Sequence, residues 1–145
     1  MKQTELNLDE PAHAELSASS AHRWIACAAS VQASRGMPDN SGQAAEEGTA
    51  AHELAEQCLL TGVEPHEYIG NEFNGFRVGQ EMANLVKMYT DYCRSLPQGF
   101  TFVERKVDYS LWVPNGWGTA DYIAIKAGEA WVVDLKFGRV PVKAD

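Results

Sequence analysis

Two acidic residues and one lysine near the end of the chain are of the types that act together on phosphodiesters. Asp121 closes the tetrapeptide Gly118-Thr119-Ala120-Asp121, and thirteen positions later comes the triplet Asp134-Leu135-Lys136. Neighbouring carboxylates repel each other, and a hard divalent cation with oxygen ligands is their natural counter-charge. Such a cation can bind a phosphate and lower the pKa of a water molecule, while a nearby ammonium stabilises the transition state. The pattern therefore predicts a metal-dependent site for phosphodiester hydrolysis, with Asp121, Asp134 and Lys136 as its catalytic residues.

The stretch that carries these groups has the alternation and turn chemistry of a β-hairpin. We predict strands over residues 117–126 and 130–137, joined by a tight turn at 127–129. Alternate side chains of a strand share a face, so Asp134 and Lys136 are expected to point the same way. In a tight register, Asp121 then lies beside Asp134. The core-facing residues of the second strand would be Trp131, Val133, Leu135 and Phe137.

A plainer alternative is a solvated hairpin face. Asp134 and Lys136 would then form an exposed ion pair, which contributes roughly 0–1 kcal/mol to stability. Two features favour the metal site instead. Asp134 lies within a strongly apolar strand, where a charged side chain needs a partner. Gly118 and Gly138 bracket the carboxylates and would allow the backbone to approach a ligand closely.

Helical patterns precede this hairpin. Hydroxyl caps and three- to four-residue apolar spacing predict helices from the serine-rich stretch 17–20 to about 34, over about 44–60 and over about 78–95. Residues 66–76 predict no more than a loop or short turn, and residues 100–109 predict a strand with Val103 and Val107 on one face. The order predicts an α/β or α+β domain over 16–145, with N-terminal helices packed on a three-stranded antiparallel meander. Residues 1–15 are expected to be a flexible lead-in.

The composition is that of an ordinary globular protein, with 45% hydrophobic and 22% charged residues. No apolar stretch has the length of a membrane span or the character of a signal peptide, so we expect a cytoplasmic protein without a membrane partner. The net charge of −8 argues against a general polyanion binder, although residues 101–145 carry 6 acidic and 6 basic side chains. Three widely spaced cysteines are expected to be free thiols, and they do not cluster with histidines as a zinc site would.

Four blocks in a fixed order make the chain resemble the RecB-like branch of the PD-(D/E)XK nuclease superfamily. The stretch from Ser17 to Cys27 is also similar to the N-terminus of an uncharacterised phage and prophage family, and the resemblance runs from about residue 13 to the end. The four blocks are Glu47-Gly48-Thr49-Ala50-Ala51-His52-Glu53, Val103-Glu104, Gly118-Thr119-Ala120-Asp121 and Val133-Asp134-Leu135-Lys136-Phe137-Gly138.

The resemblance implies a role for each of these positions. His52 is similar to the helix histidine that completes the metal shell, Asp121 and Asp134 resemble the metal carboxylates, and Lys136 resembles the catalytic lysine. Glu104 matches an acidic position that some relatives carry on the first strand; a simple sheet-face acid is the alternative. For His52 the alternative is a packed helix histidine. The implied cofactor is Mg²⁺ or Mn²⁺, and the implied fold is a restriction-endonuclease-like core.

The chain also departs from the family pattern in two ways. Cys27 resembles the N-terminal cysteine of iron–sulfur members, but their three C-terminal cysteines have no counterpart here, so we expect a buried thiol and no iron–sulfur cluster. The sequence also stops before the helix on which RecB-like members carry Gln-x-x-x-Tyr. We therefore expect an incomplete core, with the missing layer left out or supplied by a partner such as a second copy completing the sheet.

Two hypotheses about function follow from the sequence. The first is a metal-dependent DNA nuclease of phage-type recombination or DNA processing, acting on linear or single-stranded DNA. The alternative is a catalytically silent or truncated nuclease fold that binds DNA or a phage recombination protein. A small-molecule enzyme is disfavoured, because the chain has no Gly-x-Gly-x-x-Gly, Walker or Gly-x-Ser-x-Gly motif. Trp112, Trp117 and Trp131 are expected to be core and sheet aromatics, although Trp117 is placed to contact a nucleotide.

Overall fold

The computed structural model describes residues 14–37 and 42–138. Its internal contacts divide the chain into two compact units. Of the described residues, 14–37 and 106–118 form the small unit, and 42–105 and 119–138 form the large unit. Mixed helices and strands confirm the α+β class that the sequence predicts.

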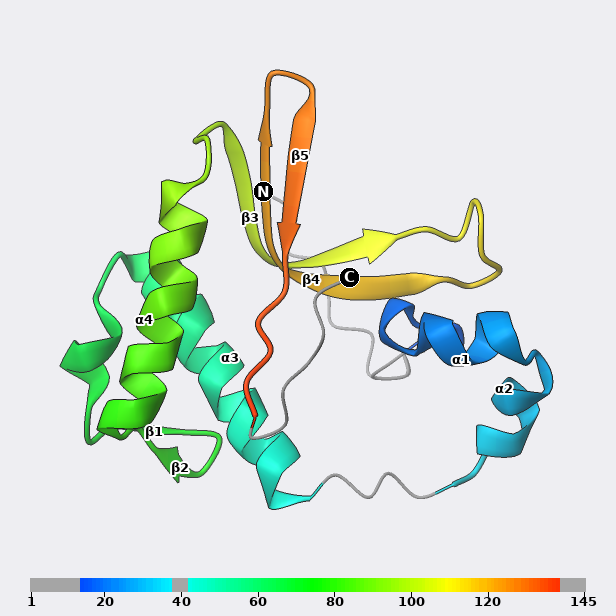
Figure 1. Ribbon diagram of the computed structural model, residues 1–145, viewed down its shortest axis with the longest axis horizontal. Helices are drawn as coiled ribbons and strands as arrows, with labels where there is room; N and C mark the ends of the chain where they lie inside the picture. Colours follow the sequence, from blue (N-terminus) through cyan, green and yellow to red (C-terminus); the bar gives the residue numbers. More distant parts are fainter. Residues whose placement is uncertain (1–13, 38–41, 139–145) are drawn as a thin grey trace, which may run out of the picture. The chain divides into compact units, whose positions relative to one another are not determined.

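Two helices form one side of the large unit. Helix α3 spans Gln43–Thr61 and helix α4 spans Gln80–Ser95, and they lie side by side (Figure 1). Gly62 ends α3 in a left-handed conformation, with φ of 77°, and its N–H donates to the Cys58 carbonyl. Small side chains on one face of α3 let the two helices approach closely. The buried residues of α3 are Ala50, Ala51, Leu54, Ala55 and Cys58.

The short connection between these helices is structured, where the sequence predicts only a loop or short turn. A 3-10 turn, η2, covers Pro65–Tyr68, and the strands β1 (Glu72–Phe73) and β2 (Phe76–Arg77) form a small antiparallel hairpin. Asn74 and Gly75 join them with φ of 44° and 77°. Positive φ at both turn residues matches the right-handed twist of the strands, which explains the Asn-Gly pair.

The main sheet has the predicted three-stranded order β3-β4-β5. Strand β3 spans Phe100–Asp108, β4 spans Trp117–Lys126 and β5 spans Glu129–Val133. Strands β4 and β5 are antiparallel, with Tyr122 opposite Val133 and Lys126 opposite Glu129. Tyr122, Ala124 and Leu135 are buried with the helices, and Trp131, Val133 and Phe137 pack against this core, as the alternation predicts.

The predicted last strand, 130–137, is too long, because β5 ends at Val133. The cause is a side chain that replaces a backbone acceptor. The N–H of Leu135 donates to Asp121 Oδ2 over 2.6 Å instead of to a strand carbonyl. The chain after β5 continues beside α3, where a Cβ on Gly48 would lie 3.6 Å from the Phe137 carbonyl oxygen (Figure 1).

The small unit contains two short helices and the tip of the β3–β4 hairpin. The 3-10 turn η1 (Ala18–Ser20) leads into α1 (Ala21–Ala26), and α2 (Ala29–Ser34) follows. The single helix predicted to Ser34 is therefore wrong, since Cys27 is extended, with φ of −148°, and interrupts it. Neither helix buries a residue, and Ile25 and Cys27 are exposed, so the expectation of a buried Cys27 thiol is also wrong.

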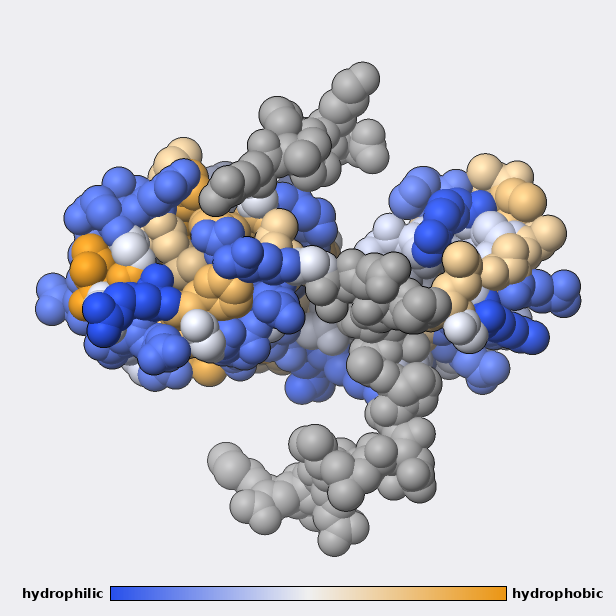
Figure 2. Space-filling view, turned by 90° about the horizontal axis from the view of Figure 1, so that it is seen from below, coloured by the Kyte–Doolittle hydropathy of each residue, from blue (hydrophilic) through white to orange (hydrophobic). Residues whose placement is uncertain are grey.

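Tyr109 joins the N-terminal segment of the small unit to its hairpin. The Tyr109 hydroxyl lies 3.1 Å from the Leu16 carbonyl oxygen and 2.9 Å from that of Trp117, so it can donate to either. The Tyr109 ring covers Gly116, where a Cβ would meet ring carbons at 2.5 Å. Glycine is therefore required at this position. On the face that Figure 2 shows, most of the described residues are hydrophilic, with smaller apolar patches between them.

Across residues 14–37 and 42–138, the structure contains no helix with the length and apolar character of a membrane span.

Cys58 and Cys93 are free and buried. Burial raises the pKa of the Cys58 thiol to about 11, so it is an unreactive core group.

Candidate metal centre

Three side chains from three separate elements converge in the large unit. His52 comes from α3, Glu104 from β3 and Asp121 from β4. Each offers one ligand atom, and these atoms lie within 4.8 Å of one another. Residues separated by up to 69 positions in the sequence thus share one site, and the sheet packing on α3 is what brings them together.

His52 and Asp121 form the closest pair of this group. His52 Nδ1 lies 3.4 Å from Asp121 Oδ2, and the two side chains are 32% and 12% exposed. The same carboxylate oxygen accepts the 2.6 Å hydrogen bond from the Leu135 N–H. A backbone donor and an imidazole therefore fix the orientation of Asp121 before any ligand binds.

Glu104 occupies an unusual backbone conformation for its residue type. Its φ is 47°, inside strand β3, although non-glycine residues rarely adopt positive φ. Such a residue in a strand bends it and re-aims the side chain, and the left-handed conformation costs about 1–2 kcal/mol. The predicted alternation across β3 fails at this point: Val103 packs on the core, whereas Val107 is exposed. The bend turns Glu104 toward His52 and Asp121.

The three side chains shift one another's pKa values, and the two carboxylates repel each other. The Asp121 carboxylate raises the pKa of His52 more than burial lowers it, and Glu104 and Asp134 add to the increase. Burial raises the pKa of Asp121, but His52 and the Leu135 N–H outweigh it and hold that pKa below its usual value. Burial and the charges of Asp121 and Glu56 raise the pKa of Glu104. A bound cation would relieve the repulsion that Glu104 experiences.

Asp134 and Lys136 lie outside this three-ligand group. They point the same way, as the alternation predicts, and pair with each other, with Nζ to Oδ2 at 2.6 Å. Their side chains are 54% and 60% exposed. The pair is still within electrostatic reach of the centre, because Asp134 raises the pKa of His52 and Lys136 lowers that of Asp121. The structure thus brings His52, Glu104 and Asp121 together and places Asp134 and Lys136 beside them.

Two residues at the site were missed by the sequence analysis. Glu56 follows His52 by one helical turn on α3, and its charge acts on Glu104. The i,i+4 spacing to His52 is a signal that could have indicated it. Tyr89 of α4 is buried, and its hydroxyl has no hydrogen-bond partner in the described part of the chain. Burial raises its pKa, and the carboxylates of Asp121 and Glu104 add to the increase. No sequence pattern marks Tyr89 as anything but a core aromatic.

The donor set fits a divalent cation of the first transition row or magnesium. One imidazole nitrogen and two carboxylate oxygens suit Mn²⁺, whereas Mg²⁺ prefers oxygen ligands alone and commonly keeps several waters. Three ligand atoms within 4.8 Å can reach a common ion with small side-chain rotations. The partial exposure of His52 leaves a path for solvent to the remaining coordination positions.

A comparison with known protein families shows which family the chain belongs to. The sequence profile of the family described as "protein of unknown function (DUF2800)" matches residues 13–145. The chain belongs to the DUF2800 family. No solved structure matches this DUF2800 chain. The three converging ligands and the Asp134–Lys136 pair all lie within the matched range.

Proposed function

We propose that this protein is a divalent-metal-dependent nuclease that hydrolyses DNA phosphodiesters in phage-type recombination or DNA processing, on linear or single-stranded DNA. The observation that carries the proposal is the convergence of His52, Glu104 and Asp121 from a helix and two strands. The order of the four sequence blocks that resemble RecB-like nucleases supports it further. A second support is the Asp134–Lys136 pair, which is close enough to shift the pKa values of His52 and Asp121.

The bound cation, Mg²⁺ or Mn²⁺, would supply a Lewis acid and a water of lowered pKa. His52, Glu104 and Asp121 would hold it, with the Leu135 N–H fixing the Asp121 carboxylate. His52 must be neutral to act as a ligand, so its proton leaves when the cation enters. The ammonium of Lys136, held by Asp134 at 2.6 Å, would move to the negative charge that builds up on the phosphate.

Metal-dependent cleavage of linear and single-stranded DNA tests the proposal. We expect Asp121→Asn to abolish measurable cleavage and Lys136→Met to slow it by about a hundredfold or more, because both act on the transition state. Lys126→Met is the matched control, since Lys126 is an exposed lysine at the far end of β4. If wild type and Lys136→Met cleave at equal rates, this centre does not perform the reaction.

One observation favours a second candidate, a catalytically silent module that binds DNA or a phage recombination protein. Lys136 and Asp134 neutralise each other and are more than half exposed. Calorimetric titration with Mn²⁺ separates the two candidates. A silent module that has kept its ligands would bind Mn²⁺ in an Asp121-dependent manner without cleaving DNA, whereas the nuclease would do both.

A further inference from the structure

The two units differ sharply in charge and in aromatic content. In the full sequence, residues 38–105 and 119–145 carry 15 acidic and 8 basic side chains, a balance of −7. Residues 1–37 and 106–118 carry 5 acidic and 4 basic side chains, a balance of −1. The small unit also contains three of the four tryptophans of the chain, namely Trp24, Trp112 and Trp117. Nearly all of the acid excess therefore lies outside the small unit, and aromatic side chains beside a few cations are the groups with which proteins bind single-stranded nucleic acid.

The tip of the hairpin in the small unit presents an unusually exposed aromatic residue. Trp112 is 77% exposed, and Leu111 beside it is also exposed. The backbone there is fixed by the Tyr109 carbonyl, which accepts hydrogen bonds from the N–H groups of Trp112 and Val113. The prediction that Trp112 is a core or sheet aromatic is therefore wrong. An exposed indole offers a flat face on which a base can stack.

A cavity of about 510 Å³ lies beside the loop of the same hairpin. Its lining includes Trp117, Lys106, Ser110 and Asn115, together with the acidic residues Glu15 and Asp108. The Lys106 ammonium lies 4.2 Å from the centre of the Trp117 ring. The volume is within the range of sites for small organic ligands, roughly 300–1,000 Å³, so a nucleotide unit can be accommodated. The Asn115 amide and the Ser110 hydroxyl in the lining of the cavity can form hydrogen bonds with a base or sugar.

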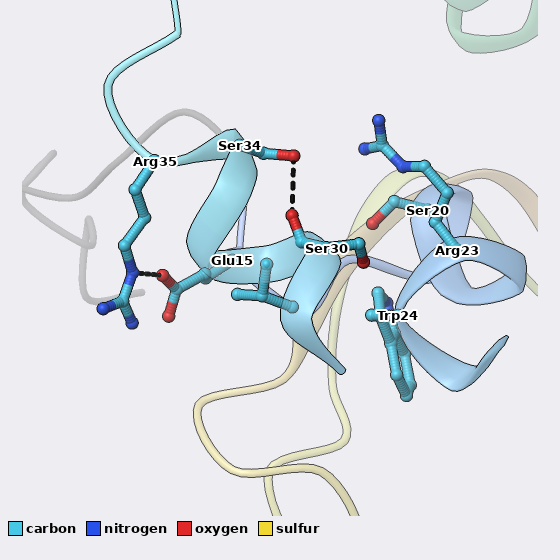
Figure 3. A pocket seen from close by; sticks show the side chains of 8 residues that line it. Glu15, Ser20, Arg23, Trp24, Ser30, Ser34 and Arg35 are labelled. Atoms are coloured by element: carbon cyan, nitrogen blue, oxygen red, sulfur yellow. Dashed lines mark hydrogen bonds and ion pairs between the residues drawn. The ribbon is translucent and has the colours of Figure 1, made fainter. Parts of the chain in front are cut away.

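A second, smaller cavity of about 190 Å³ lies among the N-terminal helices (Figure 3). Arg23, Trp24 and Arg35 line it together with three serines. Arg35 is paired with Glu15, whereas Arg23 has no ion-pair partner among the described residues. Trp24 is held in place by its Nε1 donating to the Ser17 carbonyl over 2.9 Å. Arg23 is therefore a cation available for a phosphate.

We infer that the small unit binds single-stranded DNA, with bases stacking on Trp112 and Trp117 and a phosphate contacting Arg23. This inference rests on the proposed nuclease function for the identity of the polymer. A single strand fits better than a duplex, because the bases of a duplex are already stacked on each other. The four basic side chains of residues 1–37 and 106–118 are also too few to neutralise the phosphates of a duplex groove.

Fluorescence anisotropy with a labelled oligothymidylate of about twenty nucleotides, long enough for several binding sites, tests the inference. The full chain is used in EDTA at low salt, so that no cleavage occurs. We expect Trp112→Ala to weaken binding by about fivefold or more, the effect of one lost base stack. Arg23→Gln should reduce the slope of log K against log salt by about 0.7, the value for one phosphate contact on a single strand. A duplex of the same length should bind more weakly.

Matched controls come from the large unit. Tyr92 is 54% exposed on α4 and Arg77 is exposed on β2, so Tyr92→Ala and Arg77→Gln remove the same kinds of group elsewhere. We expect both to bind as the wild type does. The inference is overturned if these controls weaken binding as much as Trp112→Ala and Arg23→Gln. It is also overturned if the wild type binds no strand, in which case the exposed hairpin tip is a contact for another protein.

The outcome can be separated from that of the nuclease proposal. Asp121→Asn should retain binding to the oligonucleotide in EDTA, because Asp121 lies in the large unit. Binding that depends on Trp112, without cleavage in Mn²⁺, would remove the proposed activity and keep the inference. If the protein cleaves oligothymidylate and the Trp112→Ala and Arg23→Gln variants bind it with unchanged affinity, the proposed activity is kept and the inference is overturned.

Discussion

The carboxylate of Asp121 accepts a hydrogen bond of 2.6 Å from the backbone N–H of Leu135, fourteen residues further along the chain. This bond ends β5, because it replaces the next rung of the strand ladder. It also fixes the candidate ligand in orientation, next to His52. One contact therefore determines both where a strand stops and how a metal-binding side chain is presented.

Removal of this acceptor should destabilise the fold. In EDTA, we expect Asp121→Ala to lower the free energy of unfolding by about 1–3 kcal/mol, the cost of leaving a buried donor unpaired. Asp121→Asn should cost less, since its amide oxygen can still accept from Leu135. Asp134→Ala is the comparison, because it breaks only an exposed ion pair and should change stability by about 1 kcal/mol or less. Urea denaturation measures all three, and an equal loss for Asp121→Ala and Asp134→Ala would contradict the role given to the Leu135 bond.

The stability of the metal-free protein should depend on the protonation of His52. Asp121 raises the pKa of His52 in the folded state above its unfolded value of about 6.5. The contribution of the pair is therefore complete below that pH and is lost as the pH rises through the folded pKa. We expect the stability difference between wild type and His52→Gln to shrink as the pH rises from about 6.5 through the raised pKa of folded His52. An NMR titration of His52 that gives a pKa below that of an exposed histidine would rule this out.

Metal affinity should change with pH in the opposite direction. The imidazole of His52 binds a cation only when it is neutral, so Mn²⁺ binding should tighten as the pH rises through the raised pKa of His52. Calorimetry at several pH values measures the effect, together with the protons released. His52→Gln should bind Mn²⁺ more weakly and lose this pH dependence, whereas a variant of the exposed His22 should keep it.

Glu104→Gln should separate stability from metal binding. Burial and the charges of Asp121 and Glu56 disfavour the ionised Glu104 side chain, so a neutral amide should raise the stability of the metal-free protein at neutral pH. The same change removes a charged ligand and should weaken Mn²⁺ binding by about tenfold or more. Thermal unfolding without Mn²⁺ measures the gain in stability, and the smaller stabilisation by added Mn²⁺ measures the weaker binding. A loss of stability in EDTA would show that Glu104 has a structural partner rather than repulsive neighbours.

Gly99 should be essential for the packing of β3 against β4. A Cβ at Gly99 would lie 2.2 Å from the Ile125 carbonyl oxygen, a backbone atom that cannot rotate away. We expect Gly99→Ala to lower the free energy of unfolding by about 2 kcal/mol or more, since the strands must shift. Gly138→Ala is the control, because its Cβ would meet no atom within 4 Å. Equal stability of the two variants in urea would contradict the close approach.

The local elements of the large unit were predictable from the sequence. The periodicity of α3, the three-strand order and the core-facing residues Trp131, Val133, Leu135 and Phe137 depend on neighbours along the chain, which sequence patterns record. The shared direction of Asp134 and Lys136 was predictable for the same reason. The six-residue helices of the small unit were not, because they bury no side chain and so have no apolar stripe to mark their ends.

Only the tertiary structure decided which of the candidate residues meet. The sequence places Asp121 and Asp134 on adjacent strands, but the bend at Glu104 and the packing of α3 select His52, Glu104 and Asp121 as the closest set. Positive φ at a glutamate and a carboxylate that ends a strand are consequences of long-range packing. No periodicity encodes them, because each depends on atoms that are distant in the chain and adjacent only after folding.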